Sequence, residues 1–157
     1  MRLLRRFILA ALLGLSFAGS LMAAETPLPF AHDLPTLAQA SVKQGLPLIL
    51  LVSLTDCKFC EQIRVKHLVP LLQTGVPVWQ IHLDTDERLV NFDGKTITER
   101  QFAKDLKVRV APSVYFFDVQ GRQIAEPLVG MMLDDFYAAY LENAIAAGRG
   151  KIGAAAR

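Results

Sequence analysis

The residues best suited to chemistry in this chain are its two cysteines, Cys57 and Cys60, which are separated by two residues. On a helix this spacing places both sulfurs within one turn, so a disulfide can form and break between them. The thiolate is the reactive form of cysteine, and the unpaired N–H groups at a helix N-terminus stabilise a negative charge. We therefore predict thiol–disulfide exchange, in which the more exposed Cys57 attacks and Cys60 resolves the mixed disulfide.

Two charged residues flank Cys57 and should tune its thiolate. Lys58 adds a positive charge that favours the thiolate, and Asp56 partly opposes it. No histidine lies between the two cysteines, so the strong extra stabilisation of a dedicated oxidant is absent. We predict a pKa of Cys57 clearly below the value of about 8.5 of a free thiol, without extreme oxidant character.

Other uses of a cysteine pair stay open on the residues alone. A zinc site needs about four ligands, and the histidines of the chain, His32, His67 and His82, are not paired at zinc spacing. A purely structural disulfide would close so small a loop that it stabilises little. A copper carrier would draw on a distant histidine. We predict redox chemistry without a metal or cofactor, and we interpret His67 and His82 as ordinary surface or boundary residues.

The elements that must position the cysteines follow from the hydrophobic pattern. Pro47–Leu54 is a continuous apolar run, typical of a central strand covered on both faces. Cys57–Val69 is predicted to be a helix, which Pro70 cannot continue without disruption. The other predicted elements are helices over 36–44, 98–107 (opened by a Thr98–Gln101 capping box) and 134–147, strands over 76–83, 113–119 and 122–129, and a polar loop over 84–97.

This order of elements predicts an α/β fold, a mixed four-stranded sheet with helices on both faces. The first two strands, joined by a helix, should be parallel. The last two strands should form an antiparallel hairpin around Gln120-Gly121. We expect an irregular arm over 25–35, one domain over 36–148 whose closing helix Gly148 ends, and a disordered tail over 149–157.

A proline at the head of the third strand adds a second motif. By itself the Ala111–Pro112 bond would be expected to be trans, since about 5–6% of X–Pro bonds are cis. However, the buried strand, the CxxC at a helix start, and the Val-Ala-Pro-Ser-Val-Tyr-Phe-Phe-Asp segment followed by Gly121 and Gly130 resemble the thioredoxin superfamily over roughly residues 36–147. The resemblance implies a thioredoxin fold in which Pro112 is cis and faces the CxxC pair. It also implies that Ala111 offers its backbone N–H and C=O to an extended substrate segment.

Within the superfamily, the chain is similar to exported thioredoxin-like proteins such as those of the SoxW kind, on its Cys-x-Phe-Cys sequence and its loop at 85–97. The resemblance implies protein disulfides as substrates and a membrane electron donor that re-reduces the cysteines. No dimerisation segment is evident ahead of the domain, so we expect a monomer. A disulfide oxidase of the same fold and a non-catalytic binding or chaperone module are the alternatives.

Several positions depart from the pattern of typical cytosolic thioredoxins. Asp56 stands where they have Trp, and Lys58-Phe59 stands where they have Gly-Pro. Leu51 replaces a buried Asp, and Gln80 replaces the Lys that pairs with it. The usual proton acceptor for Cys60 is therefore missing, and Glu61, Asp56 or solvent water would have to serve.

The N-terminus has the pattern of a secretory signal peptide. A basic start, Met1–Arg6, is followed by an apolar run and then by small residues, and we expect cleavage after Ala24, with an uncleaved membrane anchor as the alternative. Three of the 17 basic residues lie in this segment, so cleavage would change the net charge from +2 to about −1. Nothing basic enough to bind nucleic acid would remain. We expect a periplasmic protein, a compartment that permits disulfide exchange.

Overall fold

The computed structural model describes residues 27–131 and 134–155, and the predicted signal peptide over 1–24 lies outside these residues. The helices are α1 (Leu34–Lys43), α2 (Lys58–Ile63), α3 (Val69–Gln73), α4 (Glu99–Asp105) and α5 (Asp134–Ala155), with a π-helical turn, η1 (Arg64–Leu68), between α2 and α3. The strands are β1 (Leu48–Ser53), β2 (Val78–His82), β3 (Arg88–Val90), β4 (Thr96–Thr98), β5 (Ser113–Phe117) and β6 (Leu128–Val129). None of the described helices is long and apolar enough to cross a membrane.

The main sheet has four strands in the order β2-β1-β5-β6, as the predicted mixed sheet requires. β1 is parallel to β2 and antiparallel to β5, and β6 is antiparallel to β5. The fourth strand is shorter than predicted, because only Leu128 and Val129 pair with β5 in a ladder. The preceding residues contact the sheet through a single bridge between Phe117 and Gln123.

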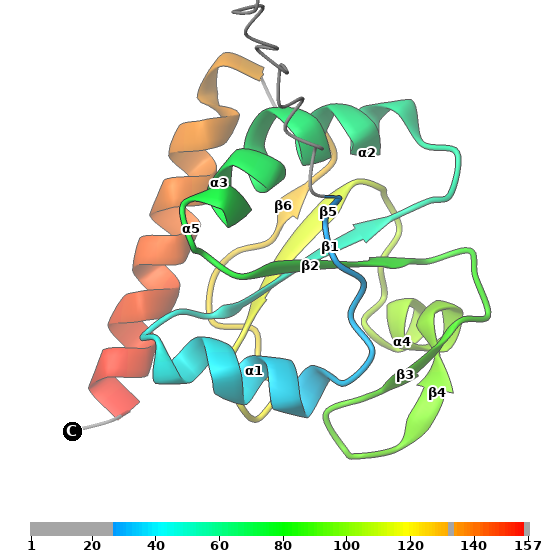
Figure 1. The fold of residues 1–157 in the computed structure, drawn as a ribbon, viewed down its shortest axis with the longest axis horizontal. Helices are drawn as coiled ribbons and strands as arrows, with labels where there is room; N and C mark the ends of the chain where they lie inside the picture. Colours follow the sequence, from blue (N-terminus) through cyan, green and yellow to red (C-terminus); the bar gives the residue numbers. More distant parts are fainter. Residues whose placement is uncertain (1–26, 132–133, 156–157) are drawn as a thin grey trace, which may run out of the picture.

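Helices cover both faces of this sheet, as Figure 1 shows. Alternate residues of β1 point to opposite faces, so Ile49 and Leu51 join one apolar cluster and Leu50 joins the other. The first cluster includes residues of α2 and α5, and the second includes residues of α1 and α4. All six residues of β1 are buried, which explains why this strand reads as a continuous apolar run.

The prediction that the helix after the cysteines ends at Val69 is wrong, but the regular α-helix is disrupted just before Pro70, as expected. The N–H of Val69 bonds to the carbonyl of Arg64, the wider spacing of a π turn. This turn changes the register just before Pro70, which then falls in the first turn of α3, where a missing N–H costs no helical hydrogen bond. The polypeptide therefore continues in helical form to Gln73.

The segment over 84–97, predicted to be a loop, contains a small second sheet of β3 and β4. The two strands pair antiparallel, from Arg88 opposite Thr98 to Val90 opposite Thr96. At the turn, the side-chain oxygen of Asn91 accepts hydrogen bonds from the backbone N–H groups of Asp93 and Lys95. Strands of three residues have too few positions to show an alternating pattern over a useful length.

The arm predicted to be irregular is in fact paired with the sheet. Phe30 forms a parallel bridge with Gln80, through hydrogen bonds of 2.9 Å from Ala31 N to Gln80 O and from Gln80 N to Pro29 O. Two residues of the arm, Leu28 and Ala31, are buried in the apolar clusters of the domain. The arm therefore covers part of the edge of β2, which would otherwise expose unpaired backbone groups.

The C-terminal tail also differs from expectation, because α5 continues through Ala155 instead of ending at Gly148. A Cβ at Gly148 would lie 3.0 Å from Pro47 Cγ. Gly148 thus allows α5 to pack closely against the start of β1 and does not act as a helix stop. The prediction of a disordered tail from residue 149 is wrong for residues 149–155.

Candidate active site

Cys57 and Cys60 are joined by a disulfide at the N-terminus of α2. Cys57 is the N-cap residue, and its sulfur accepts a hydrogen bond of 3.1 Å from the backbone N–H of Cys60. Cys57 is partly exposed, whereas Cys60 is completely buried. The predicted roles are compatible with this placement, because Cys57 is the cysteine with exposed surface and Cys60 has none. The same N–H would favour a thiolate on Cys57 in the reduced state.

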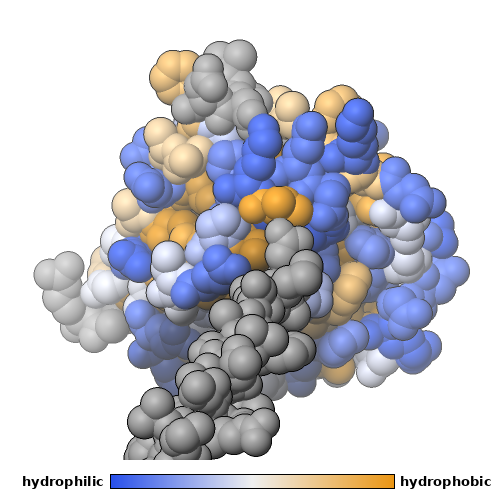
Figure 2. All heavy atoms as spheres, turned by 45° about the horizontal axis from the view of Figure 1, so that its top comes forward, coloured by the Kyte–Doolittle hydropathy of each residue, from blue (hydrophilic) through white to orange (hydrophobic). Residues whose placement is uncertain are grey.

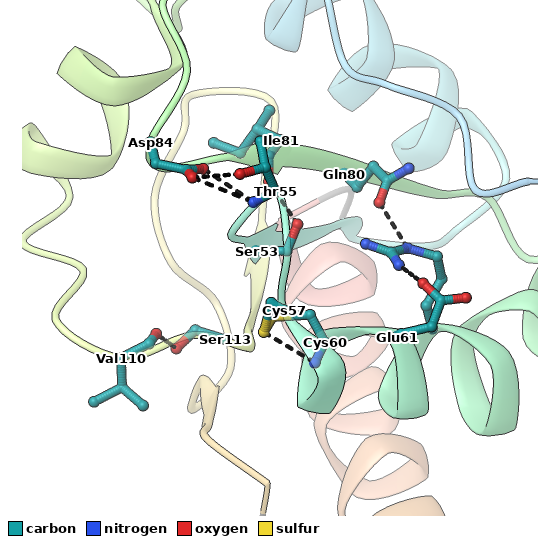
Figure 3. Close-up of a disulfide and its surroundings, with 11 residues drawn as sticks. Ser53, Thr55, Cys57, Cys60, Glu61, Gln80, Ile81, Asp84, Val110 and Ser113 are labelled. Atoms are coloured by element: carbon teal, nitrogen blue, oxygen red, sulfur yellow. Dashed lines mark hydrogen bonds and ion pairs between the residues drawn. A yellow bond between two sulfur atoms is a disulfide. The ribbon is translucent and has the colours of Figure 1, made fainter.

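The segment with Ala111 and Pro112 lies at the same edge of the sheet as the disulfide. Val52 pairs with Ser113, so the residues that follow β1 and those that precede β5 leave the sheet together. The Ala111–Pro112 peptide bond is cis, as the resemblance implied. Figure 3 shows Val110 and Ser113 near the disulfide, where the Ser113 hydroxyl donates a 2.7 Å hydrogen bond to the Val110 carbonyl.

The backbone of Ala111 is available for a new partner. The carbonyl of Pro112 accepts a 2.7 Å hydrogen bond from Gly130 N, which ties this segment to β6. By contrast, within the described residues neither the N–H nor the C=O of Ala111 forms a hydrogen bond. Ala111 is partly exposed, so an extended peptide could bind to these two groups as an added strand.

Apolar side chains are exposed around this segment. Phe59, between the cysteines, is 55% exposed, and Val110, Val129 and Met131 are each at least 40% exposed. Most other residues on the face of the molecule shown in Figure 2 are hydrophilic, with hydrophobic ones exposed in separate groups. Exposed apolar residues beside a reactive sulfur are suited to contact with a polypeptide substrate.

Asp56 and Lys58, the predicted tuning residues, lie on either side of Cys57 and are both exposed. Water around exposed groups weakens their Coulomb interaction with the sulfur. Their influence on the Cys57 thiolate stays a prediction.

The structure adds a pair of residues that sequence reasoning missed, Thr55 and Asp84. Asp84 accepts hydrogen bonds from the Thr55 hydroxyl at 2.7 Å and from the Thr55 backbone N–H at 3.1 Å (Figure 3). Thr55 follows β1 and Asp84 follows β2, so the pair ties the loop before Cys57 to the neighbouring strand. The sequence did contain a signal for this pair, because polar residues that directly follow two parallel strands lie at the same edge of the sheet.

These hydrogen bonds lead to a prediction about acid stability. Desolvation raises the pKa of Asp84, but the bonds from Thr55 and the nearby His82 outweigh it and lower the pKa below 3.8. A lowered native pKa stabilises the fold above the unfolded-state value, and this contribution disappears as the pH falls through the native pKa. We expect Asp84→Asn to narrow the difference in the free energy of unfolding between neutral pH and a pH of about 3, measured by urea denaturation.

The matched control for this prediction is Asp93→Asn, which removes an exposed carboxylate whose oxygens accept no hydrogen bond from the described residues. It should leave the pH dependence of stability as in the wild type. An equal effect of both substitutions would mean that Thr55 does not favour the ionised form of Asp84.

Leu51 and Gln80, two of the positions that depart from typical thioredoxins, have structural roles in this protein. Leu51 is completely buried in the apolar cluster beneath α2 and α5. The side chain of Gln80 donates a 2.6 Å hydrogen bond to the Leu28 carbonyl and accepts one of 2.9 Å from Arg64 Nε. Gln80 therefore links the N-terminal arm to the helix that carries the cysteines.

Of the groups that could accept the proton of Cys60, Glu61 is already engaged in an ion pair with Arg64 and is 58% exposed. It borders a cavity of about 350 Å³, whose lining also includes Thr55, Arg64, Gln80 and His82. This cavity opens beside α2 and is wide enough for water. Neither cysteine is among the residues that line it, so Glu61, Asp56 and solvent water all stay predicted acceptors for the proton of Cys60.

The two histidines that attract attention in the sequence are in aromatic contacts. The ring of His67 lies 4.7 Å from that of Tyr137, and the ring of His82 lies 5.0 Å from that of Phe30. Burial raises the pKa of Tyr137, so this phenol stays neutral. In residues 27–131 and 134–155, no three His, Cys, Asp or Glu side chains form a group that could hold a metal ion.

Comparisons with known proteins identify a family for this chain. The sequence profile of a family described as a thioredoxin-like domain matches residues 35–145. No curated protein matches the sequence significantly. Similar solved structures include a thioredoxin-fold protein from Helicobacter pylori, with 19% identity, a TM-score of 0.49, and coverage of 70% of this chain and 73% of that chain.

Two further solved structures are similar at the same level. Thioredoxin f2 from Chlamydomonas reinhardtii is 17% identical, with a TM-score of 0.49 and coverage of 73% of this chain and 95% of that chain. The C-terminal domain of DsbD from Neisseria meningitidis, in its oxidised form, is 19% identical, with a TM-score of 0.49 and coverage of 73% of this chain and 98% of that chain.

Proposed function

The chain belongs to the thioredoxin-like domain family, and on that premise we propose that it reduces or exchanges the disulfides of proteins in the periplasm. The family and the Cys57–Cys60 disulfide support a thiol–disulfide oxidoreductase at the general level. The observation that carries the proposal is the placement of this pair at the N-terminus of α2, with one sulfur accessible and the other buried.

The reaction begins with both cysteines reduced. The Cys57 thiolate attacks one sulfur of the substrate disulfide, whose S–S bond breaks as a mixed disulfide forms, and the leaving thiolate takes up a proton. Cys60 then loses its proton to Glu61, Asp56 or solvent water and attacks the Cys57 sulfur, which releases the second substrate cysteine as a thiol. Two electrons pass to the substrate, and the Cys57–Cys60 disulfide is the product on the enzyme.

Substrates would bind through the backbone of Ala111, beside Pro112. A short added strand can be recognised through its main chain, which gives affinity with little sequence specificity. Phe59 and the exposed apolar residues near Pro112 would contact the substrate side chains. We propose that the protein acts as a monomer on protein disulfides and that a membrane electron donor re-reduces it.

The direction of electron flow depends on the reduction potential. Stabilising the Cys57 thiolate favours the reduced protein and so makes it a stronger oxidant. We expect a potential nearer to about −270 mV, typical of thioredoxin reductants, than to about −120 mV, typical of a strong oxidase. Equilibration with glutathione buffers measures it, and a value of about −120 mV would favour the oxidase alternative.

The location in the periplasm rests on the signal-peptide pattern of residues 1–24. N-terminal sequencing of exported protein should find a chain that begins at Glu25, whereas a chain that still begins at Met1 would contradict cleavage. The narrower resemblance to the SoxW kind stays a prediction.

A binding or chaperone module on the same fold is the second candidate, which the exposed apolar residues around Pro112 would also suit. Reduction of insulin disulfides in the presence of dithiothreitol separates the two functions. We expect the purified protein to accelerate insulin reduction at catalytic concentrations. No acceleration with insulin or any other disulfide substrate would favour the binding module.

A further inference from the structure

A basic pocket lies next to the candidate active site. It has a volume of about 280 Å³ and lies between the end of β2 and the C-terminal half of α4. Its lining contains four cationic side chains and three apolar residues: Arg100, Lys104, Lys107, Arg109, Leu83, Ala103 and Val108.

Three of the four cationic side chains in this pocket have no ion-pair partner among the described residues. Arg100 forms an ion pair of 2.9 Å with Asp86. Lys104, Lys107 and Arg109 form no ion pair with any described residue, and all three are exposed.

The other carboxylates nearby accept hydrogen bonds from uncharged groups outside the pocket lining. Asp84 is bonded to Thr55, and Asp105 accepts a 2.7 Å hydrogen bond from Gln101. Glu99 is buried and accepts hydrogen bonds from the His82 N–H and the Thr85 hydroxyl. These carboxylates keep their negative charge, but none of them lines the pocket, whose lining holds four cationic side chains and no acidic one.

This pocket is connected to the redox site in two ways. Along the chain, Arg109 precedes Ala111 by two residues. Through hydrogen bonds, Arg100 donates to the Asp84 carbonyl at 2.7 Å, and the Asp84 carboxylate holds Thr55 in the loop before Cys57. A peptide bound at Ala111 with a residue near Cys57 would thus place adjacent residues within reach of the pocket.

Lys107, one of the residues that line the pocket, has an unusual backbone conformation. Its φ is 59°, the one positive φ of a non-glycine residue in the described part of the chain. This position ends α4 and accepts glycine with less strain than any other residue. The Val108 N–H donates a 2.9 Å hydrogen bond to the Ala103 carbonyl, so Lys107 occupies the αL position of a helix C-cap, and this cap fixes its backbone at the pocket.

From these observations we propose that the pocket binds an acidic segment of the substrate protein, next to the cysteine whose disulfide is exchanged. The proposal rests on the proposed function and adds a substrate preference to it. The exposed apolar residues Val110, Val129 and Met131 gather around Gly130, so the other flank of the substrate cysteine would meet apolar surface. Opposite charges at such a rim accelerate encounter and select partners.

Two disulfide-bridged, fluorescence-quenched peptides test the proposal. They share one sequence except for three residues beside a cysteine, which are Glu in one peptide and Gln in the other. At low ionic strength we expect kcat/KM for the Glu peptide to exceed that for the Gln peptide by about tenfold, the size of a few exposed ion pairs. The ratio should approach one in about 1 M salt, where charges are screened beyond about 3 Å.

Lys104→Glu/Lys107→Glu should remove or reverse this preference at low ionic strength. The matched control, Lys43→Glu/Arg149→Glu, changes the net charge equally at exposed positions outside the pocket and should keep the wild-type ratio. A preference that survives Lys104→Glu/Lys107→Glu would overturn the proposal. The proposal would also be overturned if phosphate abolished the preference for the Glu peptide and chloride of equal ionic strength did not. That result would indicate a site for a small anion.

The same measurements distinguish the substrate preference from the oxidoreductase activity. If the wild type reduces both peptides at equal rates, the acidic-segment proposal is wrong and the oxidoreductase function stands. If it reduces neither peptide and also leaves insulin intact, the proposed function itself is wrong.

Discussion

Replacing Cys57 with serine should lower insulin reduction to the rate observed without the protein. Serine keeps the N-cap position of α2, because its hydroxyl can accept the N–H of residue 60 as the sulfur does. A hydroxyl at this site has no base to activate it, however, and no longer provides a thiolate. Loss of activity in a variant that still folds would assign the first attack to this residue.

Cys60→Ser should fail at a different step. Its Cys57 can still attack, but the buried resolving sulfur is absent, so the mixed disulfide with the substrate persists. We expect a covalent complex in stoichiometric amount, seen by non-reducing electrophoresis and by mass spectrometry, and little turnover. Circular dichroism of both variants checks that the fold is retained.

The pair of variants gives each cysteine its own signature. If Cys57→Ser instead trapped substrates and Cys60→Ser did not, the buried sulfur would be the attacking one, and the assignment from exposure would be wrong. Equal turnover by both variants would show that neither cysteine carries the reaction.

The largest effect on stability is expected from Phe116→Ala. Phe116 is completely buried in β5, opposite Ile49 of the central strand, in the cluster that also contains Ile63 of α2 and Tyr137 of α5. Removing an aromatic side chain from such a core leaves a cavity and costs about 3–5 kcal/mol. Since folded domains are stable by only about 5–15 kcal/mol, the variant should lose much of its stability.

The control for this substitution is the same change at an exposed position. Phe136 on α5 is 56% exposed, so Phe136→Ala should cost about 0.5 kcal/mol or less. Guanidinium denaturation followed by circular dichroism measures both variants. A smaller loss for Phe116→Ala than for Phe136→Ala would contradict the packing of β5 against α2 and α5.

Much of the fold and the centre of the site were predictable because their signals are local or periodic. Cys57 and Cys60, the helix that follows them and the buried run of β1 are each encoded by neighbouring residues. The cap of α4 is local too, since Thr98 accepts a hydrogen bond from the N–H of Gln101. The cis Ala111–Pro112 bond was expected from the resemblance, since the residues alone favoured trans.

Two differences concern residues that commonly end helices. Gly148 was interpreted as a helix stop, but in the structure it leaves room for Pro47, a neighbour in space. Pro70 was expected to disrupt the helix, and the disruption is a π turn before it, after which the chain stays helical to Gln73. Neither outcome is encoded within the few residues around these positions.

What the sequence by itself determined is thus the reactive pair, the order of the elements and the sheet that holds them, because hydrophobic periodicity and capping act over short distances along the chain. Tertiary structure alone decided the polar contacts that join strand ends and loops: Thr55 with Asp84, Gln80 with Arg64 and Leu28, and the basic residues around Leu83. A polar side chain finds its partner only after the backbone has brought distant segments together. No local pattern reveals which of its many candidates that partner will be.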